Sequence, residues 1–287
     1  MSIRHFDVLP KPYKAYGKVI LSLIKKPKVK TKTLPQAEYI VDRLNIDEKH
    51  LKAYNDICTF KNDGTVPAMY LAVLAQSLQM SMMTEEPFPF ALLGMVHIRN
   101  VVRQTRKIKA DEVLSLSCKF GELRPHDKGQ QFDFLTSASV NGEEVYSGVT
   151  TYLVRSKMAE SKDKAPKAES DKPVYPDSEQ WSIPENIGRR YAAISGDVNL
   201  IHIHEYTAKA FGFKRAIAHG MWTKARSLAA LGDLPDAYEA DVQFKLPVFI
   251  PTKVTLQSLK DSSLAIQFEL NDAKDSKPHL SGQVIAQ

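Results

Sequence analysis

The chain has 287 residues, of which 43% are hydrophobic and 25% charged, so it is long enough for one large or two medium globular domains. No apolar run approaches the ~20 residues that span a bilayer, and the stretch from Val19 to Ile24 lacks the features of a signal peptide. The two cysteines, Cys58 and Cys118, indicate neither a disulfide framework nor a metal-ligand pair. A reducing cytoplasm is therefore the expected location.

The first 34 residues carry the excess of positive charge. Arg4 and eight lysines stand against Asp7 alone, a balance of +8, whereas the whole chain is +6. Residues 35–287 are therefore slightly acidic, which argues against a nucleic-acid-binding core. Prolines interrupt segment 1–34, and apolar residues between Tyr13 and Ile24 recur at roughly helical spacing. One interpretation is a helix packed on the body. The other is a landing site for a polyanion, such as an acidic carrier protein or an anionic membrane, which it would contact weakly.

Residues 35–155 have the pattern of one long helix and several strands. The stretch from 69 to about 83 is apolar on nearly every side, which predicts a helix buried all round. Alternating apolar residues at Leu114, Leu116 and Cys118 predict a strand. His97 lies in another probable strand, where a structural histidine with satisfied hydrogen bonds is the expected role.

Residues 156–176 mix five lysines with four acidic residues, and no apolar periodicity runs through them. This composition predicts a solvated, charged linker between two nearly equal halves.

Residues 177–287 repeat the pattern of the first half. The run 218–222 opens an apolar helix that reaches about Leu231, as 66–70 opens the helix of the first half. Alternation at Val242, Phe244, Leu246 and Val248, and again from Leu264 to Leu270, predicts strands. A Ser-Gly pair enters the last strand of each half, at 147–148 and 281–282. The pattern indicates a duplicated α+β layer in which an antiparallel sheet wraps a helix.

The densest chemistry lies between Tyr191 and His202, where Asp197, Asn199 and His202 fall within six residues. Gly196 favours a turn here, and a turn could direct Asp197 and His202 into one cavity. Further along, Gly220 stands where the second helix is expected to begin, and free N–H groups at a helix start can receive a developing oxyanion.

Three motifs in order carry a resemblance to a known family. They are Ser195-Gly196-Asp197-x-Asn199-x-x-His202, then Ala210-x-Gly212-Phe213, then the run 217–221. Together they resemble the signature of MaoC-like (R)-specific enoyl-CoA hydratases and 3-hydroxyacyl-thioester dehydratases, over about residues 177–287. The first half resembles the degenerate first repeat of two-repeat members. Leu200 replaces a usual proline and His204 a common aspartate, so loop geometry or substrate fit could differ.

The resemblance implies a tandem, or double, hot-dog fold and an acid–base site. A water would lie between Asp197 and His202, and the Gly220 N–H would polarise the thioester carbonyl. Residues 35–155 would be a non-catalytic repeat, because they lack the Asp-x-Asn-x-x-His loop and have Pro67-Ala68 where the second half has His219-Gly220. Support or substrate binding is expected from Asn199, Ser195, Tyr191, His219 and Met221. His219 is expected to fix the turn before Gly220, and His204 to be a solvated loop residue.

The implied reaction is the reversible hydration of trans-2-enoyl thioesters, or dehydration of (R)-3-hydroxyacyl thioesters, in fatty-acid metabolism. The substrate would be linked to coenzyme A or to acyl carrier protein, with no cofactor and no metal. An Asp–His pair suits this chemistry because a histidine pKa lies near ~6.5. Thioester hydrolysis and non-catalytic acyl binding are the alternatives, since a fold alone does not settle a function. A homodimer is a further expectation.

Overall fold

The computed structural model describes residues 2–11, 33–92, 94–155, 174–261 and 265–287, and these build a single sheet of eleven strands. The sheet order is β1-β2-β4-β5-β6-β3-β8-β11-β10-β9-β7. Its strands are β1 (Ser2–Phe6), β2 (Ala37–Leu44), β3 (Met95–Gln104), β4 (Leu114–His126), β5 (Gly129–Val140), β6 (Glu143–Arg155), β7 (Asp177–Ile183), β8 (Tyr238–Phe244), β9 (Thr252–Lys260), β10 (Ile266–Asp272) and β11 (Pro278–Ala286).

The two halves have the same strand connectivity. The order β2-β4-β5-β6-β3 in the first half matches β7-β9-β10-β11-β8 in the second, and all of these neighbours pair antiparallel. Each half places one long helix between its first and second strands, α3 (Ala68–Glu85) and α7 (Gly220–Ala230). Two copies of a helix wrapped by an antiparallel sheet are the predicted tandem fold, which is thereby confirmed.

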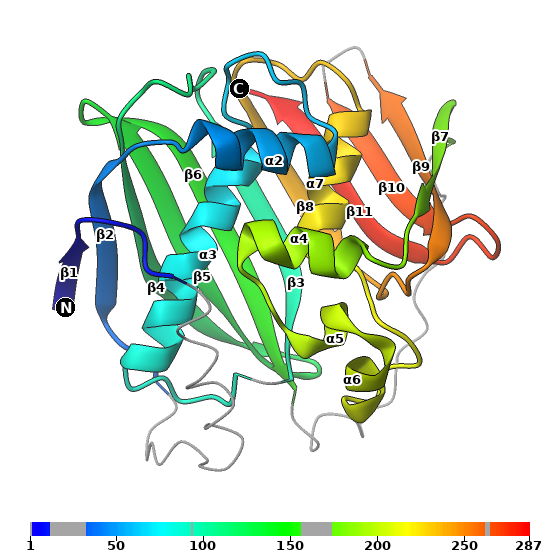
Figure 1. Ribbon diagram of the computed structural model, residues 1–287, viewed down its shortest axis with the longest axis horizontal. Helices are drawn as coiled ribbons and strands as arrows, with labels where there is room; N and C mark the ends of the chain where they lie inside the picture. Colours follow the sequence, from blue (N-terminus) through cyan, green and yellow to red (C-terminus); the bar gives the residue numbers. More distant parts are fainter. Residues whose placement is uncertain (1, 12–32, 93, 156–173, 262–264) are drawn as a thin grey trace.

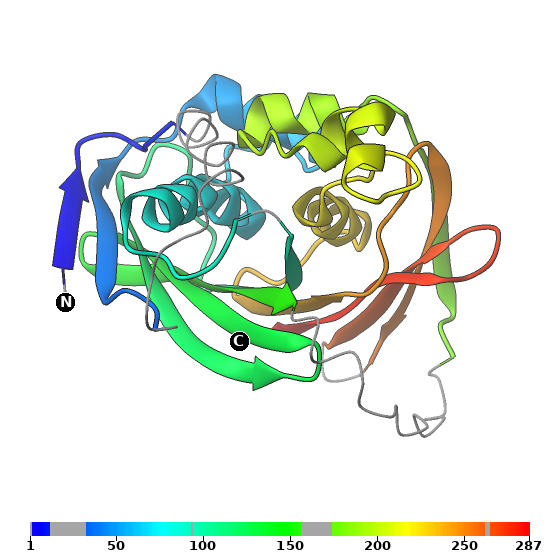
Figure 2. The same ribbon diagram turned by 90° about the horizontal axis from the view of Figure 1, so that it is seen from below.

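The remaining helices form a second layer over the two central ones. They are α2 (Glu48–Cys58), α4 (Ile187–Ser195), α5 (Leu200–Ile203) and α6 (Glu205–Ala210). Figure 2 shows the sheet curving around α3 and α7 from below, with this second layer above them. Being covered on both sides explains why α3 is apolar nearly all round and buries residues along its whole length.

The halves join where β3 pairs antiparallel with β8, near the middle of the sheet in Figure 1. Arg99 of β3 donates two hydrogen bonds to the carboxylate of Asp241 on β8, at 2.9 and 2.7 Å. Behind this pair Lys224 of α7 is fully buried. Its Nζ donates to the backbone and side-chain oxygens of Asn100, both at 2.7 Å, and to the Ala240 carbonyl at 3.0 Å. Three acceptors match the three donors of an ammonium group, although burial lowers the pKa of Lys224.

Most predicted strands are present, but one ends earlier than the alternation suggested. β8 stops at Phe244, so Leu246 and Val248 lie beyond it, and Leu246 is exposed. Pro247 is the physical reason, because proline has no N–H to donate to the ladder and is therefore excluded from the interior of a paired strand. Leu264, the start of the other alternating run, lies outside the described residues.

The segments flanking the two halves are described only in part. Residues 156–173 of the predicted linker and 12–32 of the basic segment, including the expected helix, lie outside the described residues. Within the basic segment, Ser2–Phe6 forms β1 and pairs parallel with Ala37–Val41 of β2, an edge strand that the sequence pattern did not predict. Both cysteines are free and buried. Among the described residues, no helix is both long and apolar enough to cross a membrane.

Candidate active site

The site begins where α4 ends. Gly196 follows the helix with φ 73°, and its N–H donates to the Ala192 carbonyl at 2.9 Å. This left-handed conformation favours glycine and closes a helix by satisfying one of its last carbonyls. The chain therefore leaves α4 abruptly and turns toward the interior of the second half.

Asp197 occupies the turn, and two neighbouring polar residues shape its backbone. The Asp197 N–H donates to Ser195 Oγ at 3.2 Å, and Asp197 Oδ1 accepts the Asn199 N–H at 3.2 Å. Asn199 is in turn the N-cap of α5, with its Oδ1 facing the Ile201 N–H at 3.5 Å. Ser195 and Asn199, both predicted support residues, thus contact the turn that carries Asp197.

His202 lies on the short helix α5, whereas the sequence suggested that it stands on the same turn as Asp197. The Asn199 cap makes the difference, because it starts a new helical turn directly after Asp197. His202 is 9% exposed, and its Nδ1 is 2.8 Å from the Ile217 carbonyl. A carbonyl accepts only, so Nδ1 carries the hydrogen and Nε2 of the neutral ring is left as a proton acceptor.

Gly188 of α4 allows α5 to lie where it does. A Cβ on Gly188 would stand 1.9 Å from the His202 carbonyl oxygen, well inside van der Waals contact. The two helices therefore meet backbone to backbone at His202. Any larger residue at 188 must push α5, and with it the imidazole, away from α4.

His219 lies against both members of the predicted pair. Its ring stacks on that of His202, with centroids 3.7 Å apart and planes 28° apart. Its Nε2 donates to the backbone carbonyl of Asp197 at 2.9 Å and is 4.0 Å from Oδ2 of the same residue. The buried Tyr191 ring also packs against the His219 ring, with centroids 5.0 Å apart. His219 therefore holds the turn of Asp197 against the start of α7.

Burial sets the charge state of the two imidazoles. It is the largest cause of a lowered pKa at His202, the His219 ring lowers that pKa further, and Asp197 opposes the change. Burial also lowers the pKa of His219, against a smaller opposing effect of Asp197. Both rings are therefore neutral at pH 7. The Asp197 side chain keeps 20% of its surface exposed, so the cluster is not sealed in the core.

Helix α7 begins beside this cluster, at Gly220, as predicted. His219 is its N-cap with extended backbone, so the first N–H groups of α7 have no acceptor within the helix. A Cβ on Gly220 would be 3.2 Å from the Phe244 ring, a tight approach that favours glycine. Met221, another predicted support residue, is buried in the first turn of α7.

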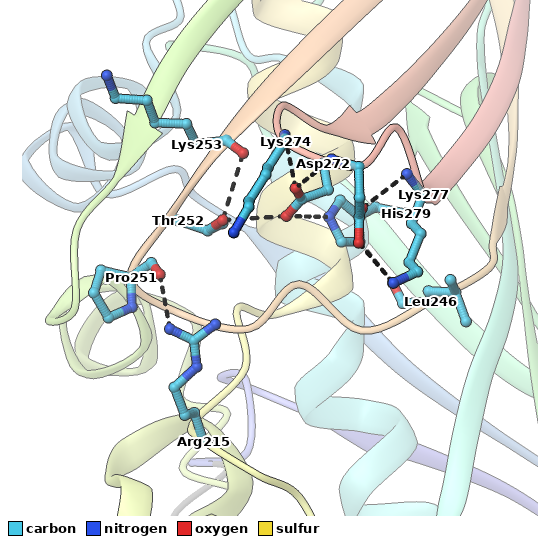
Figure 3. A network of polar contacts seen from close by, with 10 residues as sticks. Arg215, Leu246, Pro251, Thr252, Lys253, Asp272, Lys274, Lys277 and His279 are labelled. Carbon is cyan, nitrogen blue, oxygen red and sulfur yellow. Dashed lines mark hydrogen bonds and ion pairs between the residues drawn. The ribbon is translucent and has the colours of Figure 1, made fainter.

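The loop before α7 is anchored to the segment between β8 and β9. Ala218 N–H donates to the Val248 carbonyl at 2.9 Å, and Ile250 N–H donates to the Ala216 carbonyl at 2.9 Å. Figure 3 shows Arg215 reaching from this loop to the Pro251 carbonyl, a hydrogen bond of 3.2 Å. These contacts fix the carbonyl of Ile217, which is the partner of His202 Nδ1.

The two other histidines considered in the sequence analysis, His204 and His97, have hydrogen-bond partners of structural kind. His204 caps α6 with its Nδ1, which accepts the Tyr206 N–H at 3.3 Å, rather than being a free loop residue. His97 lies on β3, and its Nε2 is 3.1 Å from the Arg99 carbonyl. Its ring also packs edge-on against Phe244, 4.9 Å away, the residue whose ring faces Gly220. Burial lowers the pKa of His97, and Asp197 is close enough to oppose that shift.

Asp197, His202 and His219 each offer one potential metal-ligating atom, and these atoms lie within 4.8 Å of one another. A ring nitrogen ligates in the plane of its ring, and the two stacked rings have planes that lie 3.7 Å apart at their centroids and only 28° from parallel. They converge poorly on one ion. The arrangement favours proton transfer over metal ligation.

One contact to the cluster was not predicted from the sequence. Gln76 on α3, in the first half, donates from Nε2 to Asp197 Oδ2 at 3.0 Å. A signal for it was present, because a buried helix that is apolar nearly all round rarely carries a long amide without a partner. The identity of that partner, 121 residues away, left no local pattern.

Two halves that each wrap a central helix with part of one continuous sheet define a double hot-dog fold, and an Asp–His cluster lies against the start of the second central helix. The MaoC like domain family matches residues 157–275. The chain is 31% identical over 256 residues to 3-hydroxyacyl-thioester dehydratase X of Mycobacterium tuberculosis, covering 89% of this chain and 91% of that relative.

Solved structures agree with the match in sequence. The crystal structure of HtdX from Mycobacterium tuberculosis superposes with a TM-score of 0.75 at 30% identity, over 87% of this chain and all of that one. A MaoC-like dehydratase from Phytophthora capsici superposes with a TM-score of 0.66 over 88% and 96% of the two chains, and at 17% identity it shows the fold alone. The chain belongs to the MaoC-like dehydratase family of hydro-lyases.

Proposed function

We propose that the protein catalyses the reversible hydration of trans-2-enoyl thioesters, and so the dehydration of (R)-3-hydroxyacyl thioesters, in fatty-acid metabolism. One observation carries the proposal: a neutral His202 with its Nε2 available as a proton acceptor lies beside Asp197, next to the free N–H groups of α7. The name of the mycobacterial relative, a 3-hydroxyacyl-thioester dehydratase, supports the same reaction.

In the proposed mechanism, Asp197, His202 and the Gly220 N–H have the same roles in hydration and in dehydration. In hydration, Asp197 and His202 hold a water, and the pair takes one proton as the hydroxyl adds to C3. The Gly220 N–H donates to the thioester oxygen as it becomes an enolate, an interaction typically worth ~3 kcal/mol. The pair then donates that proton to C2, which completes the 3-hydroxyacyl thioester. Dehydration reverses these steps, and the lowered pKa of His202 favours its return to the neutral form.

Five further residues have supporting roles in this proposal. Asn199 and Ser195 shape the turn of Asp197, and His219 connects that turn to α7. Tyr191 packs behind His219, and Met221 packs beside Gly220. These contacts favour positioning over direct contact with substrate.

We also propose a division of the chain into four segments. We assign 1–34 as a basic segment, 35–155 as a non-catalytic repeat, 156–176 as a charged linker, and 177–287 as the catalytic repeat. The short connection between α2 and α3 leaves the first half without its own Asp–His loop. We expect this half to leave room for the acyl chain beside the site.

Partners and location are inferred from charge and chemistry. Coenzyme A and acyl carrier protein are both acidic, so the basic segment 1–34 would speed capture of either, and it would add a weak contact to anionic membranes. The salt dependence of KM, compared between the two carriers, tests this role. A homodimer and a cytoplasmic location stay predictions, to be tested by sedimentation and cell fractionation.

Loss of enoyl absorbance on hydration, followed with crotonyl, octenoyl and longer thioesters, tests the reaction. Asp197→Asn and His202→Ala should each lower kcat at least ~100-fold, the usual scale for acid–base groups. His204→Ala is the matched control, an imidazole two residues away that caps α6, and it should keep kcat within about threefold of wild type. Near-wild-type turnover in a folded Asp197 or His202 variant would remove the assignment. Release of free thiol without hydration would favour a thioesterase. The absence of any turnover would favour a non-catalytic acyl-binding protein.

A further inference from the structure

The Asp197 carboxylate is held from both halves of the molecule. On one side Oδ1 accepts the Asn199 N–H from the same turn at 3.2 Å. On the other, Oδ2 accepts from Nε2 of Gln76 at 3.0 Å, and Gln76 belongs to the central helix of the half that has no Asp–His loop. Two donors on opposite oxygens fix the rotation of a carboxylate more firmly than one.

Gln76 differs from the polar residues around it on α3. The Ser77 hydroxyl donates to the Leu74 carbonyl of its own helix at 2.8 Å. The Gln79 amide, one turn on, donates to Thr150 Oγ1 of β6 in the same half at 3.3 Å. Gln76 instead sends its hydrogen bond across to the second half, into the cluster that carries the chemistry.

We propose that Gln76 is a positioning residue for Asp197, so that the active site is a composite of both halves. This inference rests on the proposed function. A hydrogen-bond donor favours the ionised form of a carboxylate, and here it also turns Oδ2 toward His219 Nε2, 4.0 Å away. The first half thus does more than leave space for an acyl chain, because one of its side chains orients a group that handles the proton.

Two substitutions in the intact chain separate orientation from simple packing. Gln76→Met keeps the length of the side chain and removes the N–H donor. Gln76→Glu keeps the shape and places a second carboxylate against Asp197. Gln79→Met is the matched control, because it removes an amide from the same helix without touching Asp197. The measurements are kcat and KM with the best enoyl-CoA substrate between pH 5.5 and 8.5, with thermal unfolding of each variant.

The expected results follow from the loss of a hydrogen bond to a charged group. In the rate of the reaction, such a bond corresponds to a factor of about 10 to 100. Gln76→Met should lower kcat by about 10-fold or more with KM within about threefold of wild type. As the pH is lowered, Gln76→Glu should lose activity at a higher pH than Gln76→Met does. The reason is that two adjacent carboxylates take up a proton more readily than one. Gln79→Met should lower the unfolding temperature and leave the pH profile unchanged.

Other outcomes separate failure of this inference from failure of the proposed function. If wild type hydrates enoyl thioesters but Gln76→Met keeps kcat within twofold, Gln76 does not position Asp197. The same conclusion follows if Gln76→Met and Gln76→Glu share one pH profile, or if Gln79→Met shifts the profile as they do. If wild type hydrates no enoyl thioester, the proposed function itself fails, and this inference fails with it.

Discussion

In the first half residues 59–67 connect the covering helix to the central one, whereas in the second half residues 196–219 make the same connection. The backbone at the end of both connections is nearly the same. Pro67 has φ −60° and ψ 138°, and His219 has φ −66° and ψ 134°. Each connection also makes one isolated β-bridge to the segment that precedes the third strand of its half.

The same helix start therefore occurs twice in the chain, once with only a short connection before it and once with a connection that carries candidate site residues. The longer connection adds α5 and α6, and with them Asp197 and His202. At the helix start, the first half has Pro67 as the cap and Ala68 as the first residue, so it offers neither an imidazole nor a glycine there. The two halves therefore differ in one connection and one helix cap, while their strands keep the same connectivity.

The largest effect is expected where the added helix meets the covering helix. Gly188→Ala would bring a Cβ to 1.9 Å from the His202 carbonyl oxygen, so α5 must move. A displacement of about 1 Å in a catalytic group costs about 100-fold in rate, which is the expected loss in kcat. Ala193→Gly, at an exposed position of the same helix, should cost about 1 kcal/mol of stability and leave kcat unchanged. Wild-type kcat in Gly188→Ala would mean that α5 tolerates the shift.

A paired substitution at the two helix starts sharpens the comparison directly. Gly220→Ala places a Cβ 3.2 Å from the Phe244 ring, so the ring or the N–H of residue 220 must shift. We expect kcat to fall about 10-fold, within the ~3 kcal/mol that one oxyanion donor supplies. Ala68→Gly makes the reverse change in the first half and should affect only stability, by about 1 kcal/mol. Steady-state kinetics on both variants measure the contrast, and equal losses of kcat would contradict it.

A smaller effect should appear in the pH dependence of stability. His202 and His219 have lowered pKa values in the folded chain, so below about pH 6.5 the unfolded chain binds more protons than the folded one. Stability is therefore complete above that pH and falls as the pH drops through it, by at most about 1.4 kcal/mol per pH unit for each buried neutral histidine. Urea unfolding at pH 7.5, 6.5 and 5.5 should show this fall. His202→Gln should reduce its slope, and an unchanged slope would mean that His202 is charged in the native state.

Much of the fold was predictable because the repeated patterns are local. Apolar residues on every side of 69–83, and the helix start at Gly220, follow from the sequence alone. Asp197 and His202 were found together because they lie five residues apart. Gln76 and Gly188 were not found, since the contact of Gln76 joins distant segments and the role of Gly188 depends on how closely two helices approach. Neither fact leaves a pattern in neighbouring residues.

The central claim is that each chain has a single active site, and the most direct test is to count the binding sites per chain. Calorimetric titration of the intact protein with a tight, unreactive analogue of a 3-hydroxyacyl thioester counts them. The account predicts one molecule bound per chain, with affinity weakened by Gly220→Ala and unaffected by Ala68→Gly. Two equivalent molecules per chain, or equal weakening by both substitutions, would contradict the claim that each chain has one site, at the start of α7.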